Sequence, residues 1–339
     1  MPDRFLLIPG TGGTDFEFQN GSPSGYAVEL LIGTLLGDDK LTAELSCTHP
    51  KIDAWPFGPD QTSLGGKGDL NPRAVLDATA YQCVPPSYTR FPYDWRLDIR
   101  YNGLLLLSYL RDQLKAHPGD RFRIVTHSQG GLVLLVASLL CGNSTEFSTY
   151  VSRIALVACP VIGTLKAMAA AIDGSNFGGF ASDFFKRASR TWAAIPQMFP
   201  QFPCVVGMPT STPFAANLWP NMPPSFPDLL ARAAGYSKWF YQGPFANLDG
   251  HIQLRFVFGR NDAPNTPIEA GFDAQKGFTI GARKVPGDSL VPCDETVAYL
   301  QSQGLRGYSD IAKGTTVKDH MELLNDPRVW SSVAGFMEG

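Results

Sequence analysis

Short apolar runs and longer helical segments alternate along the first half of the chain. Phe5–Ile8, Phe122–Val125 and Val151–Ala158 are runs of strand length that end at turns or polar loops. Between them, Ile99–His117 has the apolar spacing of an amphipathic helix, and Leu132–Leu140 is apolar and of helical length. Strands that alternate with helices in this way predict a mostly parallel, doubly wound α/β sheet.

Weaker patterns predict further elements. The expected helices are Tyr26–Leu36, Asn71–Tyr81 and, at the end of the chain, Val329–Met337. The expected strands are Leu41–Cys47, Tyr88–Phe91, Ile252–Phe258 and Gly277–Lys284. Asp53–Asn71 is rich in Pro, Gly and Asp, which predicts a long loop.

The character of the chain changes between residues 161 and 250. Strand patterns are missing there, and short helical patterns at Leu165–Ile172, Ala181–Trp192 and Pro227–Tyr236 alternate with loops rich in Pro, Phe, Trp and Met. We interpret 161–250 as a helical cap inserted into an α/β core that consists of 1–160 and 251–339.

Composition narrows the class of protein. The chain has 339 residues, of which 44% are apolar and 17% charged, with a net charge of −3 and no Lys/Arg block. This balance provides a large core and argues against nucleic-acid binding. No apolar stretch approaches the length of a membrane span, and residues 1–4 lack a signal-peptide pattern, so we expect a cytoplasmic protein unless a leader precedes the chain.

The six cysteines are widely spaced. No Cys-x-x-Cys pair or Cys/His cluster predicts a metal site, and we expect no cofactor. An even number of cysteines permits disulfides without requiring them.

The stretch Thr126-His127-Ser128-Gln129-Gly130-Gly131 lies between an expected strand and an expected helix. This is the context of a nucleophile elbow, a tight strand–turn–helix that exposes a serine hydroxyl at the carboxyl edge of a sheet. Gly130 provides one of the small positions that the turn needs, and Thr126 stands where the pattern G-x-S-x-G has glycine. Gly131 allows the helix to begin close to the strand. The N–H of Gln129 is the expected first donor to an oxyanion.

A second glycine-rich turn, Pro9-Gly10-Thr11-Gly12-Gly13-Thr14, follows the first strand. A strand that ends in such a loop presents main-chain N–H groups, and in a serine hydrolase the second oxyanion donor comes from this position. We expect Thr11 to be that donor, with Gly12 as the alternative. The competing interpretation, a phosphate-binding loop, lacks the lysine and the glycine spacing of such motifs.

A serine nucleophile needs a histidine base and an acid that orients the base. In α/β-hydrolases the acid and then the histidine follow the serine along the chain, and only His320 lies downstream in a loop before the last helix. Asp262 and Asp288 both follow expected strands, so order and spacing leave both open as the acid. Asp294 and Asp319 are weaker candidates.

Several segments resemble the lecithin:cholesterol acyltransferase family, which includes phospholipases and phospholipid:diacylglycerol acyltransferases. The most specific is Pro92-Tyr93-Asp94-Trp95-Arg96, followed by the His-Ser-x-Gly elbow. Others resemble the family in the same order: Ile8–Gly10, Cys159–Thr164, Ile195–Pro200, Gly287–Pro292 and Asp319–Leu324. The resemblance implies an α/β-hydrolase fold with a cap.

The resemblance also bears on individual residues. Gly287–Pro292 is similar to the family's Gly-Asp-Gly-Thr-Val-Pro, whose aspartate is the triad acid, and this implies Asp288 rather than Asp262. Asp94 and Arg96 are expected to form a structural pair near the site. The chain departs from the family at Thr126 and at Ser289-Leu290, where the family has glycine and Gly-Thr.

Together these observations predict a serine esterase or lipase with the triad Ser128, Asp288 and His320. It would hydrolyse a hydrophobic carboxylic ester or lipid through an acyl-enzyme, with transient lipid contact through the cap. The first alternative is an acyltransferase that passes the acyl group to an alcohol, and the second is a non-catalytic ligand-binding protein on the same fold. The aromatic residues of the cap either line an acyl pocket or, as we expect for most of them, form the cap's own core.

Overall fold

The computed structural model describes ten stretches of the chain. They are residues 3–13, 16–18, 70–72, 81–142, 144–175, 183–243, 248, 250–305, 308–313 and 319–339, with backbone only at 16–18, 70–72, 184 and 308–313. The predicted helix at 26–36, the strand at 41–47 and most of the loop at 53–71 lie outside them. The predicted helix at 71–81 begins instead in β3 (Leu70–Pro72), which pairs antiparallel with β2 (Phe16–Phe18), and its residues 73–80 are also outside.

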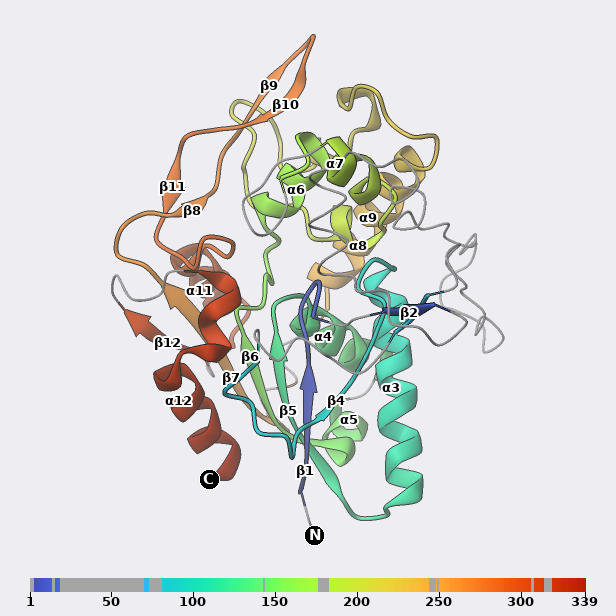
Figure 1. Cartoon of the computed structure of the whole chain (residues 1–339), viewed down its shortest axis with the longest axis vertical. Coiled ribbons are helices and arrows are strands. Elements are labelled where there is room, and N and C mark those ends of the chain that lie inside the picture. Colours follow the sequence, from blue (N-terminus) through green and yellow to red (C-terminus); the bar gives the residue numbers. More distant parts are fainter. Residues whose placement is uncertain are drawn as a thin grey trace.

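Six described strands form one parallel sheet in the order β4-β1-β5-β6-β7-β12 (Figure 1). Their bounds are β1 (Asp3–Ile8), β4 (Thr89–Arg90), β5 (Arg121–His127), β6 (Val151–Val157), β7 (Gln253–Arg260) and β12 (Tyr308–Lys313). The parallel sheet is the one that the alternating pattern predicts. β12, an edge strand, was not anticipated because Tyr308–Lys313 has no long apolar run.

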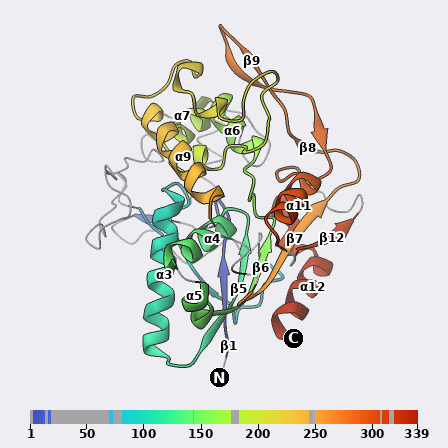
Figure 2. The ribbon, with the colours of Figure 1, turned by 180° about the vertical axis from the view of Figure 1, so that it is seen from behind.

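Alternate side chains of β1, β5, β6 and β7 enter two different cores. Leu6, Ile8 and Ile124 pack with the apolar residues of α3 (Ile99–Ala116) and α4 (Gln129–Cys141). Leu7 and Val125 pack with those of α12 (Pro327–Glu338) on the other side. Figures 1 and 2 show α3, α4 and α5 (Ser144–Tyr150) covering one face of the sheet and α12 the other. Because both faces are covered, the strands are apolar on both sides.

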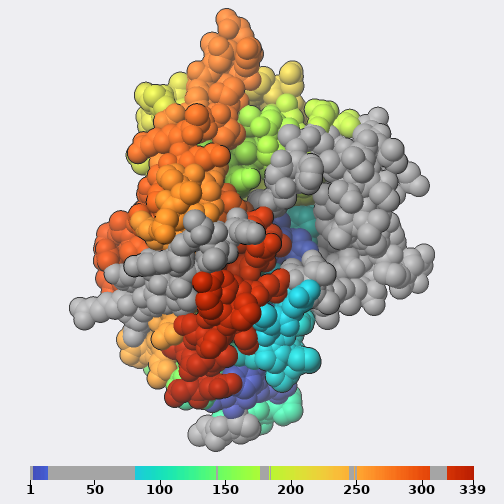
Figure 3. All heavy atoms as spheres, turned by 60° about the vertical axis from the view of Figure 1, so that its left-hand side comes forward, coloured from blue at the N-terminus to red at the C-terminus, as the bar shows by residue number. Residues whose placement is uncertain are grey.

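The C-terminal helix is held in place at its carboxyl end. Arg123 and Arg153, on neighbouring strands, donate hydrogen bonds to the carbonyls of Met337 and Phe336 at the end of α12. These carbonyls have no partner within the helix, and the cations also oppose the negative end of its dipole. Figure 3 shows the red C-terminal segment against the cyan segment that begins at residue 81.

The segment before α12 is a short 3₁₀ helix, η3 (His320–Asn325). The N–H of Gln82 donates to Asn325 Oδ1 at 2.8 Å, and the ring of Tyr88 packs against Trp330 with centroids 5.6 Å apart. The contacts of α12 and of residues 82–88 therefore determine where His320 lies.

The direction of the strand order reverses at β1, because β4 pairs on one side of it and β5 on the other. In open α/β sheets the loops at the carboxyl ends of strands on either side of such a reversal leave a crevice, and ligands bind there. The loop after β1 and Ser128 after β5 therefore flank this crevice.

Helices above this edge of the sheet form the cap (Figure 1). They are α6 (Leu165–Ile172), α7 (Asp183–Ser189), α8 (Ala194–Gln197), η1 (Thr212–Phe214), η2 (Ala216–Leu218) and α9 (Phe226–Tyr241). The three predicted helices are confirmed as α6, α7 and α9, within a few residues. The division of the chain at 160/161 and 250/251 stays a prediction.

The expected strand at 277–284 corresponds to two short strands outside the main sheet. β10 (Gly277–Ile280) pairs antiparallel with β9 (Ala270–Asp273), and β11 (Lys284–Val285) pairs with β8 (Thr266–Pro267). The β9–β10 hairpin contacts the cap, since Phe278 packs against Trp219 with ring centroids 4.9 Å apart. Local pattern predicts extended backbone here but not the partner strand.

Among the described helices, none is long and apolar enough to cross a bilayer. α11 (Cys293–Ser302), which the apolar pattern did not predict, follows the Gly287–Pro292 segment directly. Cys83, Cys159 and Cys204 are free thiols. Burial raises the pKa of the Cys159 thiol well above its ordinary value, so this thiol is a packing group.

Candidate active site

Ser128 occupies a strained turn between β5 and α4. Its φ is 52° and its ψ is −127°, a conformation that costs a residue with a side chain about 1–3 kcal/mol. The turn is held by its neighbours, because the N–H of Ser128 donates to the Val157 carbonyl at 2.9 Å and its carbonyl accepts from Gly131 at 3.0 Å. The predicted strand–turn–helix context is confirmed.

Close approach of the helix to the strands explains the two glycines after Gln129. A Cβ on Gly130 would lie 2.4 Å from the carbonyl oxygens of Ile8 and Pro9, which are main-chain atoms of the neighbouring segment. A Cβ on Gly131 would lie 3.2 Å from Thr126 Oγ1. The Sγ and Cβ of Cys159 would be nearer still, at 2.5 and 2.8 Å, so the missing side chain of Gly131 leaves room mainly for Cys159.

The Pro9–Gly13 loop is pinned from several sides. The N–H of Gly13 donates to the Gly10 carbonyl at 3.0 Å, and Gly12 has a φ of 76° that favours glycine. Tyr93 Oη donates to the Pro9 carbonyl at 2.8 Å. A Cβ on Gly10 would lie 2.8 Å from Ser128 Cβ, so this loop lies directly against the serine.

The two residues expected to supply oxyanion donors contact each other. Thr11 Oγ1 donates to Gln129 Oε1 at 2.7 Å, and Gln129 Nε2 donates to the Trp95 carbonyl at 2.9 Å. The side chain of Gln129 thereby holds the Thr11 loop beside the first turn of α4. The N–H of Gln129 is one of the N-terminal helix donors that have no partner within the helix. In the described part of the chain, no residue accepts from the N–H of Thr11.

Asp288 and His320 form a buried pair. Asp288 Oδ2 lies 2.8 Å from His320 Nδ1, and the two side chains are 1% and 2% exposed. Asp288 Oδ1 accepts from the N–H groups of Leu290 and Val291 at 3.0 and 2.7 Å, which fixes the carboxylate. A carboxylate oxygen can only accept, so Nδ1 of His320 donates to Asp288, and in the neutral imidazole Nε2 is then the acceptor.

His320 Nε2 is buried and has no hydrogen-bond partner among the described residues. Ser128 Oγ therefore makes no hydrogen bond to it in this structure. Such bonds are often long without a substrate and form in the substrate complex. The structure thus brings together Asp288 with His320, and Gly10 with Ser128, at one edge of the sheet.

The other acidic candidates lie elsewhere. Asp262 is 60% exposed and pairs with Arg260 at 3.0 Å, and Asp294 pairs with the same arginine at 3.2 Å. Neither contacts His320. Asp319 caps η3 and accepts from Ser289 Oγ at 3.3 Å. The side chain of Asp262 turns toward a surface arginine, whereas that of Asp288 meets His320, so the geometry favours Asp288 as the acid.

Ser289 stands where the resembling family has glycine, and the structure shows why glycine suits the position. Its φ is 76°, which a glycine adopts without strain. The serine hydroxyl instead bonds Asp319, the residue before His320. A second contact thus joins the segment of the acid to the segment of the histidine.

Asp94 and Arg96 form the structural pair that was expected. Arg96 Nε and Nη2 donate to the two carboxylate oxygens of Asp94 at 2.9 and 2.7 Å, and both side chains are buried. The Arg96 carbonyl accepts from the N–H of Ala194 at 3.3 Å. The pair stabilises the loop between β4 and α3 beneath the cap.

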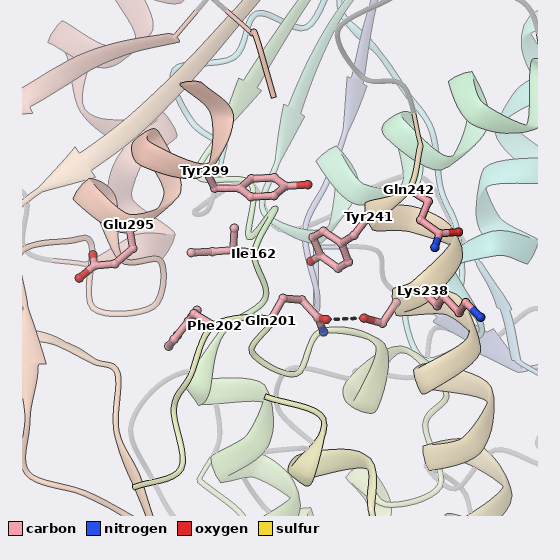
Figure 4. A pocket seen from close by; sticks show the side chains of 9 residues that line it. Ile162, Gln201, Phe202, Lys238, Tyr241, Gln242, Glu295 and Tyr299 are labelled. Carbon is pink, nitrogen blue, oxygen red and sulfur yellow. Dashed lines mark hydrogen bonds between the residues drawn. The ribbon is translucent and has the colours of Figure 1, made fainter. Parts of the chain in front are cut away.

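The aromatic side chains of the cap mostly form its own core. Trp219 stacks on Phe199 with centroids 5.5 Å apart and packs edge-on against Phe226 at 5.4 Å, and all three are buried. A separate cavity of about 450 Å³ lies between α9 and α11 (Figure 4). Tyr241 and Tyr299 line it, and none of the triad candidates does. Of the described large apolar side chains, only Leu105 and Val206 are exposed.

Sequence reasoning missed two residues behind the histidine. His127 Nε2 lies 3.1 Å from the His320 carbonyl, and His127 Nδ1 lies 3.3 Å from Tyr81 Oη. No local pattern in the sequence shows what His127 contacts. Burial and the neighbouring His320 lower the pKa of His127 to about 3.

Part of this chain is similar in sequence to a known protein family. Residues 86–222, which include the elbow and much of the cap, match the model of the lecithin:cholesterol acyltransferase family. Over this part of its length, the chain is similar to that family. No curated protein sequence matches it.

One solved structure supports the fold over nearly the whole chain, and two others are less similar. The Tle4–Tli4 complex contains a chain that is 14% identical, with 99% of this chain and 98% of that chain covered and a TM-score of 0.58. Mature lipase BlEst2 of Bacillus licheniformis is 13% identical, with 74% and 80% covered and a TM-score of 0.40. Phospholipase PlaB of Legionella pneumophila is 11% identical, with 77% and 40% covered and a TM-score of 0.34.

In the part of the chain that the structure describes, no group of three His, Cys, Asp or Glu side chains is arranged to hold a metal ion. The groups that the structure places at this edge of the sheet are a hydroxyl, an imidazole, a carboxylate and main-chain N–H groups. This set suits acyl transfer.

Proposed function

We propose that this chain is a serine hydrolase that cleaves a hydrophobic carboxylic ester through an acyl-enzyme. The observation that carries the proposal is the buried Asp288–His320 pair, at 2.8 Å, on the same sheet edge as the strained Ser128. A carboxylate that fixes the Nδ1 proton of a histidine leaves Nε2 free to act as a base.

In the first half-reaction Ser128 Oγ attacks the ester carbonyl while His320 Nε2 takes the hydroxyl proton. The tetrahedral oxyanion accepts hydrogen bonds from the N–H groups of Thr11 and Gln129, and each such donor typically contributes about 3 kcal/mol to the transition state. His320 then gives its proton to the leaving alcohol, and the acyl group remains on Ser128. Water, activated by His320, hydrolyses the acyl-enzyme in the second half-reaction.

The match of residues 86–222 to the lecithin:cholesterol acyltransferase family supports a lipid-like ester as the substrate. The apolar cap above the crevice agrees with a bulky hydrophobic acyl group. Brief contact of the cap with a lipid surface remains part of the proposal.

The same family match favours one second candidate function, transfer of the acyl group to an alcohol. The acyl-enzyme is identical in the two reactions, and only the acceptor differs. Adding a long-chain alcohol during ester hydrolysis and quantifying the new ester by mass spectrometry separates them. Acyl transfer is expected to produce the new ester at the expense of the free acid.

The proposal is tested by incubating the protein with a fluorophosphonate and locating the adduct by mass spectrometry. We expect an adduct on Ser128 that is lost in Ser128→Ala and strongly slowed in His320→Ala. A folded protein that fails to react even with a short probe in detergent would contradict the proposal and favour a non-catalytic ligand-binding protein.

A further inference from the structure

A chain of hydrogen bonds runs behind the Asp288–His320 pair. The N–H of Gly10 donates to Tyr81 Oη at 3.0 Å. Tyr81 Oη lies 3.3 Å from His127 Nδ1, and His127 Nε2 lies 3.1 Å from the His320 carbonyl. Tyr81 and His127 are each 1% exposed, so solvent does not compete for these bonds.

The chemistry of the groups fixes the direction of every bond. The carbonyl of His320 can only accept, so His127 Nε2 carries the proton. In a neutral imidazole Nδ1 is then an acceptor, and Tyr81 donates its hydroxyl proton to it. The oxygen of Tyr81 still accepts from Gly10, so these hydrogen bonds can all form with only one arrangement of their protons.

This series of hydrogen bonds joins two loops whose relative position a serine hydrolase must maintain. Gly10 belongs to the loop that lies against Ser128 and contains Thr11. The carbonyl at the other end belongs to His320 itself. The rings of His127 and His320 also pack together, with centroids 5.0 Å apart and planes inclined by 35°.

We propose that His127 and Tyr81 are positioning residues, which couple the Gly10–Gly13 loop to the main chain of His320 and so place its imidazole for proton transfer. This inference depends on the proposed function, because it assigns His320 the role of base. Neither side chain touches the reacting atoms. Their effect on the reaction is carried by the position of His320.

Two substitutions separate this role from simple packing. In His127→Gln the terminal amide nitrogen reaches about as far as Nε2 and can still donate to the His320 carbonyl. In His127→Asn the amide nitrogen lies nearer the position of Nδ1, so the bond to His320 is lost. Both variants are neutral, polar and smaller than histidine, so a packing role would affect both.

The measurements are the rate of fluorophosphonate labelling of Ser128 and the kcat and KM for a p-nitrophenyl ester, with the thermal midpoint of every variant. We expect His127→Asn to lower kcat by about 100-fold with little change in KM, because a misplacement of about 1 Å has that effect. We expect His127→Gln to stay within about tenfold of the unmodified chain, on the same principle of smaller displacement.

Tyr81→Phe completes the test, since it removes one hydroxyl and keeps the ring. We expect Tyr81→Phe to lower kcat moderately in the otherwise unmodified protein. In the His127→Asn variant, where the series of hydrogen bonds is already broken, we expect almost no further loss of kcat. Additive losses, or equal kcat for the Asn and Gln variants, would overturn the inference. If the unmodified chain does not label on Ser128 at all, the proposed function fails, and that outcome is visible before any variant is compared.

Discussion

Two serines at the site have strained backbone conformations that hydrogen bonds from neighbouring segments maintain. Ser128 and Ser289 both have positive φ, at 52° and 76°, which among the described residues with side chains only Ala158 and Asn221 share. Ser128 is held by main-chain bonds from β6 and α4, and Ser289 by bonds to Thr266 Oγ1 and Asp319. The surrounding contacts thus maintain conformations that these residues would avoid in isolation.

The two acidic candidates give the sharpest comparison at this scale. Asp288→Asn removes the acceptor that fixes the Nδ1 proton of His320, and we expect kcat for a p-nitrophenyl ester to fall by about 10³–10⁴-fold. Asp262→Asn is the matched control, because its exposed ion pair with Arg260 contributes about 0–1 kcal/mol at most. Comparable activities of the two variants in a steady-state assay would rule out Asp288 as the acid.

The buried neutral His127 predicts a pH dependence of stability. Its pKa is about 3 in the folded protein, where it faces Tyr81, His320 and Asp288, whereas a histidine in an unfolded chain has a pKa of about 6.5. Between these values the unfolded state binds the extra proton, so the folded state loses about 1.4 kcal/mol per pH unit as the pH falls. The contribution is complete above pH ~6.5, on this linkage argument.

Urea unfolding at pH 6.5 and 4.5 checks this expectation, and His127→Gln removes the group. The unmodified chain is expected to lose about 2–3 kcal/mol more than His127→Gln between the two pH values. His251→Gln, which removes an exposed histidine, is the control for deleting a histidine as such. Parallel losses in the unmodified chain and His127→Gln would show that His127 takes up no proton on unfolding.

At the scale of elements, the site depends on how closely α4 approaches β1. The main-chain oxygens of Ile8 and Pro9 lie where a side chain on Gly130 would begin. The elbow, the loop after β1 and the first turn of α4 therefore form one packed unit. Gln129 strengthens it through its bonds to Thr11 and Trp95.

Two Gly→Ala substitutions in helices test this packing, and we expect them to change the free energy of unfolding in opposite directions. Gly130→Ala places a methyl 2.4 Å from two carbonyl oxygens, and we expect it to destabilise the fold by about 1–3 kcal/mol or more and to abolish labelling of Ser128. Gly235→Ala in α9 meets no atom within 4 Å, and we expect it to stabilise the fold by about 0.5–1 kcal/mol. Urea denaturation measures both, and a neutral Gly130→Ala would contradict the close approach.

At the scale of the whole molecule, the cap and the β9–β10 hairpin share one aromatic cluster. Trp219 contacts Phe199 and Phe226 within the cap and Phe278 in the hairpin, and its Nε1 donates to the Pro213 carbonyl at 2.9 Å. The hairpin is distant from the cap in sequence but packs as part of it. The two are therefore expected to open together.

Trp219→Ala tests this coupling. Loss of a buried tryptophan typically costs about 3–5 kcal/mol, and here it removes the contact between cap and hairpin. Hydrogen exchange is expected to increase in α9 and in β10 together, while β5 and β6 keep their protection. Increased exchange in the hairpin alone would show that the two segments open independently.

The local pattern of the sequence determined most elements of the core and the place of the candidate nucleophile. Apolar runs identify β1, β5, β6 and β7 because strands covered on both faces need continuous apolar side chains. The elbow is identifiable for a similar reason, since a tight turn requires small residues at fixed positions. The choice of His320 also follows from the sequence, because it is the histidine that follows Ser128 and lies in a loop before the last helix.

Tertiary structure alone decided the rest. Asp262 and Asp288 both follow strands, and only the fold shows that one side chain meets Arg260 at the surface while the other meets His320 in the interior. β12, the pairing of the hairpin and the contact of His127 with His320 depend on segments far apart in the chain. Such contacts are set by how layers pack against each other, and no local pattern of apolar and polar residues records which distant partner a side chain will meet.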